Sequence, residues 1–495
     1  MVARGQIKNI NKYLLIGILG TLSIVMHWPH FQKELVSIHV WRQVETQTTI
    51  QNFYREDFNI LNPRLDNRGN GSGIHRMEFP LMQWLTACLY RIFGEHLIIT
   101  RIFMFLIGLF TLAGMYELVH RIFNRKLPAV IAALTLNFSP GFYYYTINPV
   151  PDNFALCCSV WGLAIFFSWI RNQKYFYLVV SCLLLSVGAL SKLPFILYFL
   201  IPWMYFITKD RKLKSYRMRT SHLIAVLVPV FLPLAWYVMV IPGWSGNPVV
   251  LGILHNDTPM LTLADYLQHN LVSTLPEILM GYGALPLFLA GIFFLIRNRI
   301  YRHELFPVYL VWGIALIAYF LFEINSIGKA HDYYLFPFYP ALFILVGYGA
   351  EKLIESKTAL LKILCFLLIL SSPVFCYARM QGRWDLESPG FNVNLLKYRE
   401  ELRNAIPDNA LCVAGNDESH RIFLYYIDKK GWTFSDDKLD PSLLRELIGK
   451  GARYLYSDSR FVDENPAINS LLGDRVLQKG SIRIYRLRTE SGSTE

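Results

Sequence analysis

The sequence predicts an α-helical membrane protein that crosses the bilayer about eleven times and carries a small α/β domain at its C-terminal end. Hydrophobic residues make up 54% of the 495 residues and charged residues only 17%, whereas a soluble protein carries about 25% charged residues. Apolar runs close to the ~20 residues that span a bilayer recur along the first 380 residues. Beyond them the apolar runs shorten and alternate with charged segments.

The apolar runs place the individual membrane spans. The first span follows Arg4, Lys8 and Lys12 and lacks a small-residue cleavage site, so we expect a retained anchor rather than a cleaved signal peptide. The expected spans are 13–29, 99–120, 127–147, 153–170, 176–192, 194–208, 222–242, 275–296, 304–322, 333–350 and 359–379.

Basic residues predict the orientation of these spans, because Lys and Arg concentrate in cytoplasmic loops. One alternate set of short loops holds 20 Lys and Arg, whereas the opposite set holds only Lys192 and Lys329. We therefore expect a protein of the inner membrane with a cytoplasmic N-terminus and a periplasmic C-terminal domain. The net charge of +12 then reflects topology and not a nucleic-acid partner.

The loops and the C-terminal segment predict two domains. A transmembrane domain covers 1–380 and includes a long first outer loop, 30–98, with helices expected over 45–53 and 81–93. The second helix is amphipathic and is expected to lie flat on the outer interface. Residues 381–495 form the α/β domain. Its expected helices are 394–405, 419–428, 441–449 and 466–472, and its expected strands are 410–414, 453–457, 474–478 and 482–487.

Ionisable side chains near the membrane indicate where function resides. Placing each such side chain at the depth of the bilayer costs roughly 2.5–3.5 kcal/mol of insertion free energy, so those that occur there are expected to have a function. In the predicted topology the unusual ones share the outer side, on segments that could converge on one cavity. They are Glu45, Glu78, Asp152, Lys192, Lys329, His331 and Asp332. The seven cysteines form no CxxC pair and show no metal-binding spacing.

Several short motifs around these residues occur in an order that resembles the GT-C glycosyltransferases. The resemblance covers roughly residues 10–350 and is to the family 39-like branch of protein O-mannosyltransferases and lipid A aminoarabinose transferases. The motifs are His39-Val-Trp-Arg42-Gln-Val-Glu45, Met77-Glu78-Phe-Pro80, Asn148-Pro-Val-Pro-Asp152, Ser191-Lys192-Leu-Pro194 and His331-Asp332-Tyr333-Tyr334-Leu-Phe-Pro337.

This resemblance implies a reaction. The donor would be a sugar on a polyprenyl phosphate, transferred with inversion to a lipid, glycan or protein acceptor outside the cytoplasm. A carboxylate would take the proton of the acceptor hydroxyl. Because phosphate is already a good leaving group, cations that hold its oxygens would replace a strong general acid. The branch that the chain resembles works without a metal or other cofactor, and we expect none here.

The resemblance also assigns candidate roles. Glu45 would be the base, and Glu78 and Asp152 would shape the acceptor pocket or hold cations in place. The residues that would bind substrate are His39, Arg42, Lys192, Lys329, His331, Asp332 and Tyr333. Two positions depart from the relatives. Val44-Glu45 stands where they usually carry an Asp-Glu pair, and Phe79 replaces the Lys of the aminoarabinose branch.

Simpler interpretations of the same residues remain open. Glu45 could be a solvated loop carboxylate, and Glu78 and Asp152 could only cap helices. Lys192 could extend to the outer interface, and His331 and Asp332 could form a local pair. The aromatic run Phe142–Tyr145 is expected to form an interfacial belt, with a sugar-site lining as the alternative.

Two other functions compete with glycosyl transfer. A transporter or flippase of lipid-linked sugars would place charges near the bilayer midplane and would contain inverted repeats with broken helices. A membrane-anchored scaffold would instead act through its C-terminal domain. The polar cluster Asn416–His420 in that domain shows no nucleophile–base spacing, which favours an accessory role.

Overall fold

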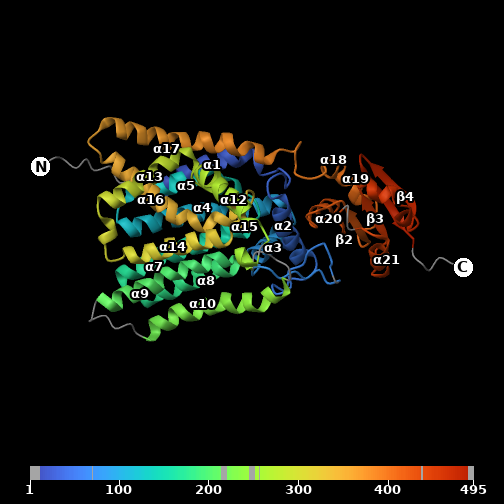
Figure 1. Ribbon diagram of the computed structural model, residues 1–495, viewed down its shortest axis with the longest axis horizontal. Helices are drawn as coiled ribbons and strands as arrows, with labels where there is room; N and C mark the ends of the chain where they lie inside the picture. Colours follow the sequence, from blue (N-terminus) through green and yellow to red (C-terminus); the bar gives the residue numbers. More distant parts are fainter. Residues whose placement is uncertain are drawn as a thin grey trace. The chain divides into compact units, whose positions relative to one another are not determined.

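The computed structural model describes residues 12–69, 71–212, 220–244, 251–255, 257–435 and 439–488. Arg4, Lys8 and the basic segment 213–219, used above to predict orientation, lie outside the described residues. The chain forms two compact units (Figure 1). Unit 1 contains residues 1–32, 77–79 and 100–381, and unit 2 contains residues 33–76, 80–99 and 382–495.

Unit 1 is helical, and its long helices lie side by side (Figure 1). Each expected span falls on one or more helical segments. The α-helices are α1 (Lys12–His27), α4 (Leu97–Phe123, which begins in unit 2), α5 (Lys126–Asn137), α6 (Pro140–Tyr145), α7 (Pro151–Asn172), α8 (Tyr175–Ser191), α9 (Leu200–Lys212), α10 (Thr220–Val240), α12 (Met260–His269), α13 (Gly281–Arg297), α14 (Phe306–Phe322), α15 (Ile324–Ile327), α16 (Tyr339–Ile354) and α17 (Ala359–Met380).

Shorter helical turns complete several of the spans. The segment η5 (Asn270–Met280) is a π-helix that continues α12 into α13. The 3₁₀ turns are η1 (Trp28–His30), η2 (Leu193–Phe199), η3 (Ile241–Gly243), η4 (Gly252–His255), η6 (Ile300–Arg302), η7 (Asp332–Phe338) and η8 (Gln381–Trp384). Among the described helical segments, six are long and apolar enough to cross a membrane, and four more are apolar but shorter.

Prolines and small residues shape this bundle. The expected span 127–147 is two helices, because Ser139 caps α6 and Pro140 occupies its first turn. Glycines allow close helix packing: a Cβ on Gly188 of α8 would collide with Ser159 of α7, and one on Gly349 of α16 would collide with Leu287 of α13. The bundle therefore depends on small residues at its helix contacts.

Unit 2 is built on a five-stranded sheet in the order β2-β1-β3-β5-β4. Strand β1 (Leu411–Gly415) pairs in parallel with β2 (Lys430–Thr433) and β3 (Tyr454–Ser457), whereas β5 (Ile482–Leu487) is antiparallel to β3 and to β4 (Leu472–Lys479). In register, Val413 lies opposite Trp432 on one side and Leu455 on the other.

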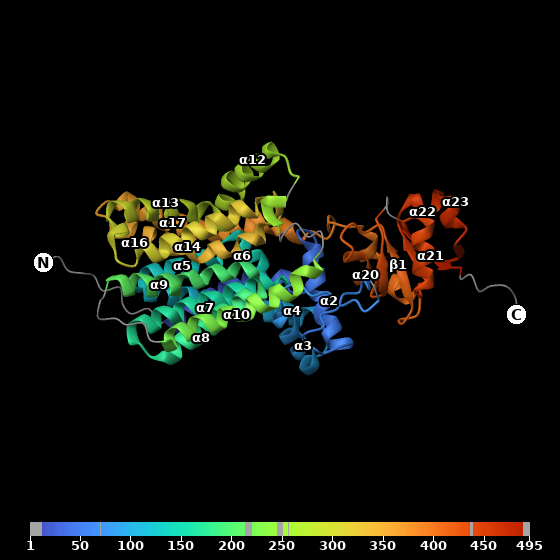
Figure 2. The same ribbon diagram turned by 60° about the horizontal axis from the view of Figure 1, so that its bottom comes forward.

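Helices cover both faces of the sheet, as Figure 2 shows for β1 between α20 and α21. One face packs against α18 (Asn394–Lys397), α19 (Arg399–Asn404) and α20 (Ile422–Ile427). The other packs against α21 (Pro441–Gly449), α22 (Arg460–Glu464) and α23 (Pro466–Asn469). Strand β2 and helix α22 were not predicted, and the helix expected over 466–472 ends at Asn469, before β4 begins at Leu472.

Segments of the first outer loop join this same unit. Helix α2 (Val40–Arg55) is longer than the expected 45–53, and α3 (Leu81–Phe93) has the expected bounds. Leu35, Val40 and Val44 are part of the hydrophobic core that also contains α20 and Tyr456. Further along α2, Ile50 and Phe53 pack against Ala87 and Tyr90 of α3. Helix α2 is therefore held between α20 and α3.

The observed helical bundle and the small α/β sheet domain confirm the predicted fold class. The predicted interfacial belt is wrong, because the side chains of this run are buried inside unit 1. Each of the four residues, Phe142, Tyr143, Tyr144 and Tyr145, is at most 1% exposed. Tyr145 shows the reason: its hydroxyl donates a hydrogen bond to Asp332, a partner that the interface could not supply.

The shared core of unit 2 is tested by Leu35→Ala. Leu35 is completely buried in the core formed with α20, so the change should destabilise unit 2 by about 2–5 kcal/mol. Hydrogen exchange followed by mass spectrometry should show faster exchange over 411–427. Leu61→Ala, at a side chain that is 48% exposed, is the control. Unchanged exchange in Leu35→Ala would contradict the shared core.

Candidate active site

Glu45 lies within a group of charged side chains in unit 2. It sits on α2 one turn after Arg42, and side chains three residues apart on a helix face the same side. The Arg42 Nη1 to Glu45 Oε1 distance is 3.2 Å, and both side chains are at most 10% exposed. A carboxylate this buried requires cations, and Arg42 is the nearest.

Two further residues complete this group. Arg421 Nε lies 3.9 Å from Glu45 Oε2, and His75 Nε2 lies 3.8 Å from Glu45 Oε1. Arg421 is at the N-terminal end of α20, on the loop that follows β1. Asp417 shapes that loop by accepting hydrogen bonds from the backbone amides of Ser419 and Phe423. The C-terminal domain and the first loop therefore both supply charges around Glu45.

Electrostatics keep Glu45 ionised. Burial raises the pKa of its carboxyl, but Arg42, Arg421 and His75 together lower that pKa below its ordinary value of about 4.5. Burial lowers the pKa of His75 below 6.5, assisted by the two arginines. At neutral pH the group contains one carboxylate, two guanidinium groups and a neutral imidazole. It can accept a proton and still has positive charge left for an anion.

The second group of charged residues lies in unit 1, around Asp152 and Lys192. Lys192 Nζ is 3.6 Å from Asp152 Oδ1 and lies 5.4 Å and 5.1 Å from the ring centres of Tyr333 and Tyr334. Asp152 is only 1% exposed, yet its Oδ2 has no hydrogen-bond partner among the described residues. This oxygen can accept a hydrogen bond from a substrate hydroxyl.

Helix ends fix the backbone positions of Asp152 and Lys192. Pro151 begins α7 and places Asp152 in its first turn, while α8 ends at Ser191, just before Lys192 and Pro194. Completely buried Arg101 donates a hydrogen bond of 2.8 Å to the Asn148 side chain, which fixes the turn before α7.

Glu78 lies near the same end of α8, because the next residue, Phe79, is hydrogen-bonded to that helix. The Phe79 amide donates to the Leu190 carbonyl at 3.0 Å, and its ring packs against Trp236 of α10. Glu78 is 8% exposed and therefore buried. These contacts fix the Glu78 backbone near the end of α8, two residues before Lys192.

The other candidates of unit 1 are Lys329, His331 and Asp332, and the His331 ring lies 5.8 Å from the rings of both Tyr333 and Tyr334. Asp332 accepts the Tyr145 hydroxyl at 2.6 Å, and the His331 ring contacts the Ser326 carbonyl through Nδ1 at 2.7 Å. Lys329 forms an ion pair of 2.6 Å with Asp265 of α12, and both side chains are about half exposed.

His39 lies outside the Glu45 charge cluster, at the N-terminal cap of α2, with a left-handed backbone (φ 55°). It lines a cavity of about 740 Å³ in unit 2, together with Trp41, Asn392, Asp417 and Asp458. An aromatic ring beside carboxylate and amide groups suits a ligand rich in hydroxyls.

The structure thus assembles Arg42 with Glu45 in one unit, and Asp152, Lys192 and Tyr333 in the other. That both groups form one cavity stays a prediction. Sequence reasoning missed His75, Arg101 and Arg421. A signal was present for Arg421, because it directly follows the polar run Asn416–His420. Among the described residues, no group of three or more His, Cys, Asp or Glu side chains could hold a metal ion.

Comparisons with known proteins show what the chain is similar to in sequence and in fold. Residues 78–237 match the family model "Dolichyl-phosphate-mannose-protein mannosyltransferase". The matched segment contains Glu78, Asp152 and Lys192 but not Glu45. No curated protein matches the chain.

Solved structures match over almost the whole chain. The apo crystal structure of ArnT from Cupriavidus metallidurans is similar with a TM-score of 0.66 and 14% identity, over 96% of this chain and 97% of that one. The same protein bound to undecaprenyl phosphate gives a TM-score of 0.65 and 13% identity, over 98% and 99%. The chain has the fold of the GT-C glycosyltransferases.

A more distant similarity extends to another member of this fold. The oligosaccharyltransferase of Archaeoglobus fulgidus matches with a TM-score of 0.59 and 12% identity, over 91% of this chain and 70% of that one. At these identities the structural matches show the GT-C fold, and the family model matches about a third of the chain. The predicted resemblance is therefore confirmed.

We predict that removing the charge of Arg421 changes the pH dependence of sugar transfer, on the assignment of Glu45 as the base. Such a base works only when ionised, so activity would be lost as the pH falls through the pKa of Glu45, which lies below about 4.5. Arg421→Gln removes a cation that lowers this pKa, so the acidic limb of the rate–pH profile should move to higher pH. Arg421→Lys keeps the charge and should move the limb less. An unchanged limb in Arg421→Gln would exclude this electrostatic role.

Proposed function

We propose that the chain transfers a sugar from a polyprenyl-phosphate donor to an acceptor hydroxyl, with inversion at the anomeric carbon. The observation that carries this proposal is the buried, ionised Glu45 between Arg42 and Arg421. A base with adjacent cations is the combination that this reaction needs. Similarity to ArnT, whose structure has been solved with undecaprenyl phosphate, supports a polyprenyl phosphate as the carrier.

The transfer step balances with these groups. The acceptor oxygen forms a bond to the anomeric carbon while the bond from that carbon to the phosphate oxygen breaks. Glu45 takes the acceptor proton, and the phosphate leaves with the electron pair. Arg42 and Arg421 offer guanidinium groups, which hydrogen-bond phosphate oxygens well. Because one positive charge remains after pairing with Glu45, the phosphate can bind without displacing the base.

The residues of unit 1 have a complementary proposed role. Lys192 is held by Asp152 beside Tyr333 and Tyr334, so its cation can face the donor phosphate while the aromatic rings contact the sugar. Asp152 Oδ2 can accept a sugar hydroxyl. Glu78 and Asp332 would orient this group, and Lys329 and His331 remain weaker candidates for phosphate contact because they have other partners.

We further propose that the reaction takes place at the outer face of the inner membrane, with lipid, glycan or protein as the acceptor. The asymmetric distribution of basic residues supports this orientation. The apolar helices would border both the membrane lipids and the polyprenyl chain of the donor. No observation in the two units favours the transporter alternative, and the matched proteins reported above are transferases.

Replacing the proposed base tests the mechanism. Glu45→Gln keeps the size of the side chain but cannot accept a proton, so transfer from radiolabelled polyprenyl-phosphate sugars in membranes should fall roughly 10²–10⁴-fold. Glu446→Gln removes a carboxylate that is 58% exposed on α21 and should leave the rate unchanged.

Binding of unlabelled polyprenyl phosphate separates chemistry from folding. Glu45→Gln should still bind this lipid, as measured by a ligand-induced shift in thermal unfolding. If Glu45→Gln transfers label as fast as the unaltered chain at matched expression, Glu45 is not the base.

A further inference from the structure

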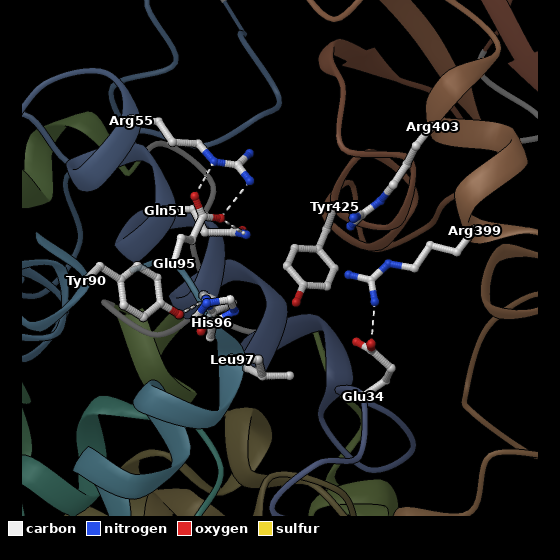
Figure 3. Close-up of a pocket in the computed structure, with 11 residues that line it drawn as sticks. Glu34, Gln51, Arg55, Tyr90, Glu95, His96, Leu97, Arg399, Arg403 and Tyr425 are labelled. Carbon is white, nitrogen blue, oxygen red and sulfur yellow. Dashed lines mark hydrogen bonds and ion pairs between the residues drawn. The ribbon is translucent and has the colours of Figure 1, made fainter. Parts of the chain in front are cut away.

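A second cavity in unit 2 lies away from the proposed transfer site. It has a volume of about 370 Å³, within the range of small-molecule sites, and its lining includes Gln47 and Gln51 of α2 (Figure 3). Gln47 is two residues after Glu45, which places it about 200° around the helix. The cavity therefore lies on the opposite side of α2 from the Glu45 carboxylate.

Three arginines line this cavity, and two of them have carboxylate partners. Arg55 pairs with Glu95 and Asp428, each at 2.6 Å, and Arg399 pairs with Glu34. Each of these two guanidinium groups therefore already has a carboxylate beside it.

The third arginine, Arg403, differs. Its Nε donates to the Tyr426 carbonyl at 3.0 Å, but no carboxylate of the described residues forms an ion pair with it. Burial, and then the neighbouring cation of Arg399, lower the pKa of Arg403. Figure 3 shows Arg399 and Arg403 extending toward the cavity beside Tyr425. An anion placed there would relieve the repulsion between the two cations.

A neutral polar side chain, Gln47, also lines the cavity. Gln47 is 1% exposed and donates through Nε2 to the Tyr90 hydroxyl at 2.7 Å. Its Oε1 has no hydrogen-bond partner among the described residues, although buried carbonyl oxygens almost always have one. This oxygen requires a donor, such as a hydroxyl group, from the ligand.

We propose that this cavity binds an acidic sugar, a saccharide residue that carries a phosphate or carboxylate group. Arg403, with Arg399, binds the oxyanion, and Gln47 Oε1 accepts a sugar hydroxyl. The volume exceeds what a small inorganic anion fills. The lining carboxylates Glu34 and Glu95 are paired with Arg399 and Arg55, which leaves Arg403 for an anionic end of the ligand and Gln47 for a hydroxyl-rich end. The site is independent of Glu45 and of the transfer reaction.

Direct binding to the full-length chain in detergent tests this proposal, with glucose 6-phosphate, glucose and inorganic phosphate as probes in isothermal titration calorimetry. Glucose 6-phosphate should bind at least tenfold more tightly than either of the other probes. Arg403→Gln should weaken its binding by tenfold or more, and Arg445→Gln, an exposed arginine on α21, should not.

Gln47→Met provides the second variant. It keeps the volume of the side chain but removes the acceptor oxygen, so it should weaken glucose 6-phosphate several-fold and leave phosphate binding unchanged. Equal binding of phosphate and glucose 6-phosphate would overturn the sugar assignment, and equal binding by Arg403→Gln and the unaltered chain would overturn the site.

A lipid headgroup is the other source of an oxyanion next to hydroxyls. The affinity for glucose 6-phosphate should be the same in phosphatidylglycerol nanodiscs as in phosphatidylcholine nanodiscs. Strong competition by phosphatidylglycerol would overturn the proposal. Because these measurements need neither donor nor transfer, Glu45→Gln should bind glucose 6-phosphate normally. Failure here and failure of the proposed transfer reaction are therefore distinguishable.

Discussion

A carboxylate that is almost fully buried must be matched by positive charge, and this constraint connects the parts of unit 2. Burial alone would push the pKa of Glu45 upward and favour the neutral acid. Arg42, one turn away on α2, supplies the nearest cation, but Arg421 comes from the loop after β1, almost 380 residues later in the chain. The C-terminal domain must therefore fold against the first loop for Glu45 to have its full set of partners.

The hydrophobic core supports the same connection. Val44 precedes Glu45 and is completely buried in the core that includes α20, the helix that begins next to Arg421. Packing thus fixes α2 against α20 in the register that brings the guanidinium group within 4 Å of the carboxylate. The C-terminal domain thus places a cation, Arg421, beside Glu45, and whether its role is accessory stays a prediction. Asp152 and Lys192 form a similar buried ion pair in unit 1, where Pro151 begins α7 and α8 ends just before Lys192.

Much of the fold could be predicted from the sequence, because long apolar runs and their basic flanks reflect membrane thickness and topology. The amphipathic helix 81–93 was predicted with its bounds, since its polar and apolar positions alternate with a clear helical period. Strand β2 was missed because it is only four residues long, contains Gly431 and gains its stability from pairing with β1. The prediction of an interfacial belt failed because aromatic residues at the end of a membrane span look the same in the sequence in both cases. They can face lipid or, like Tyr145, hydrogen-bond a buried carboxylate.

The candidate site was predictable only in part. Arg42 and Glu45 share one helix face and could be linked by their spacing alone. His75 and Arg421 reach Glu45 through tertiary contacts that carry no local pattern, so no spacing rule could find them. Gln47 and Arg403 illustrate the same limit, because neither residue stands out in the sequence. Only the structure shows that, among the described residues, Gln47 Oε1 has no hydrogen-bond partner and Arg403 no carboxylate in an ion pair.

The ionisation of Glu45 is the most direct measure of this account. Infrared difference spectroscopy on the full-length chain with ¹³C-labelled glutamate, subtracting the spectrum of Glu45→Gln at each pH, isolates the carboxylate band of this residue. We predict that the band persists as the pH falls to about 4.5 and is lost only below it, because the cations around Glu45 hold its pKa down. A midpoint above 4.5 would show that burial outweighs Arg42 and Arg421, and would contradict the account.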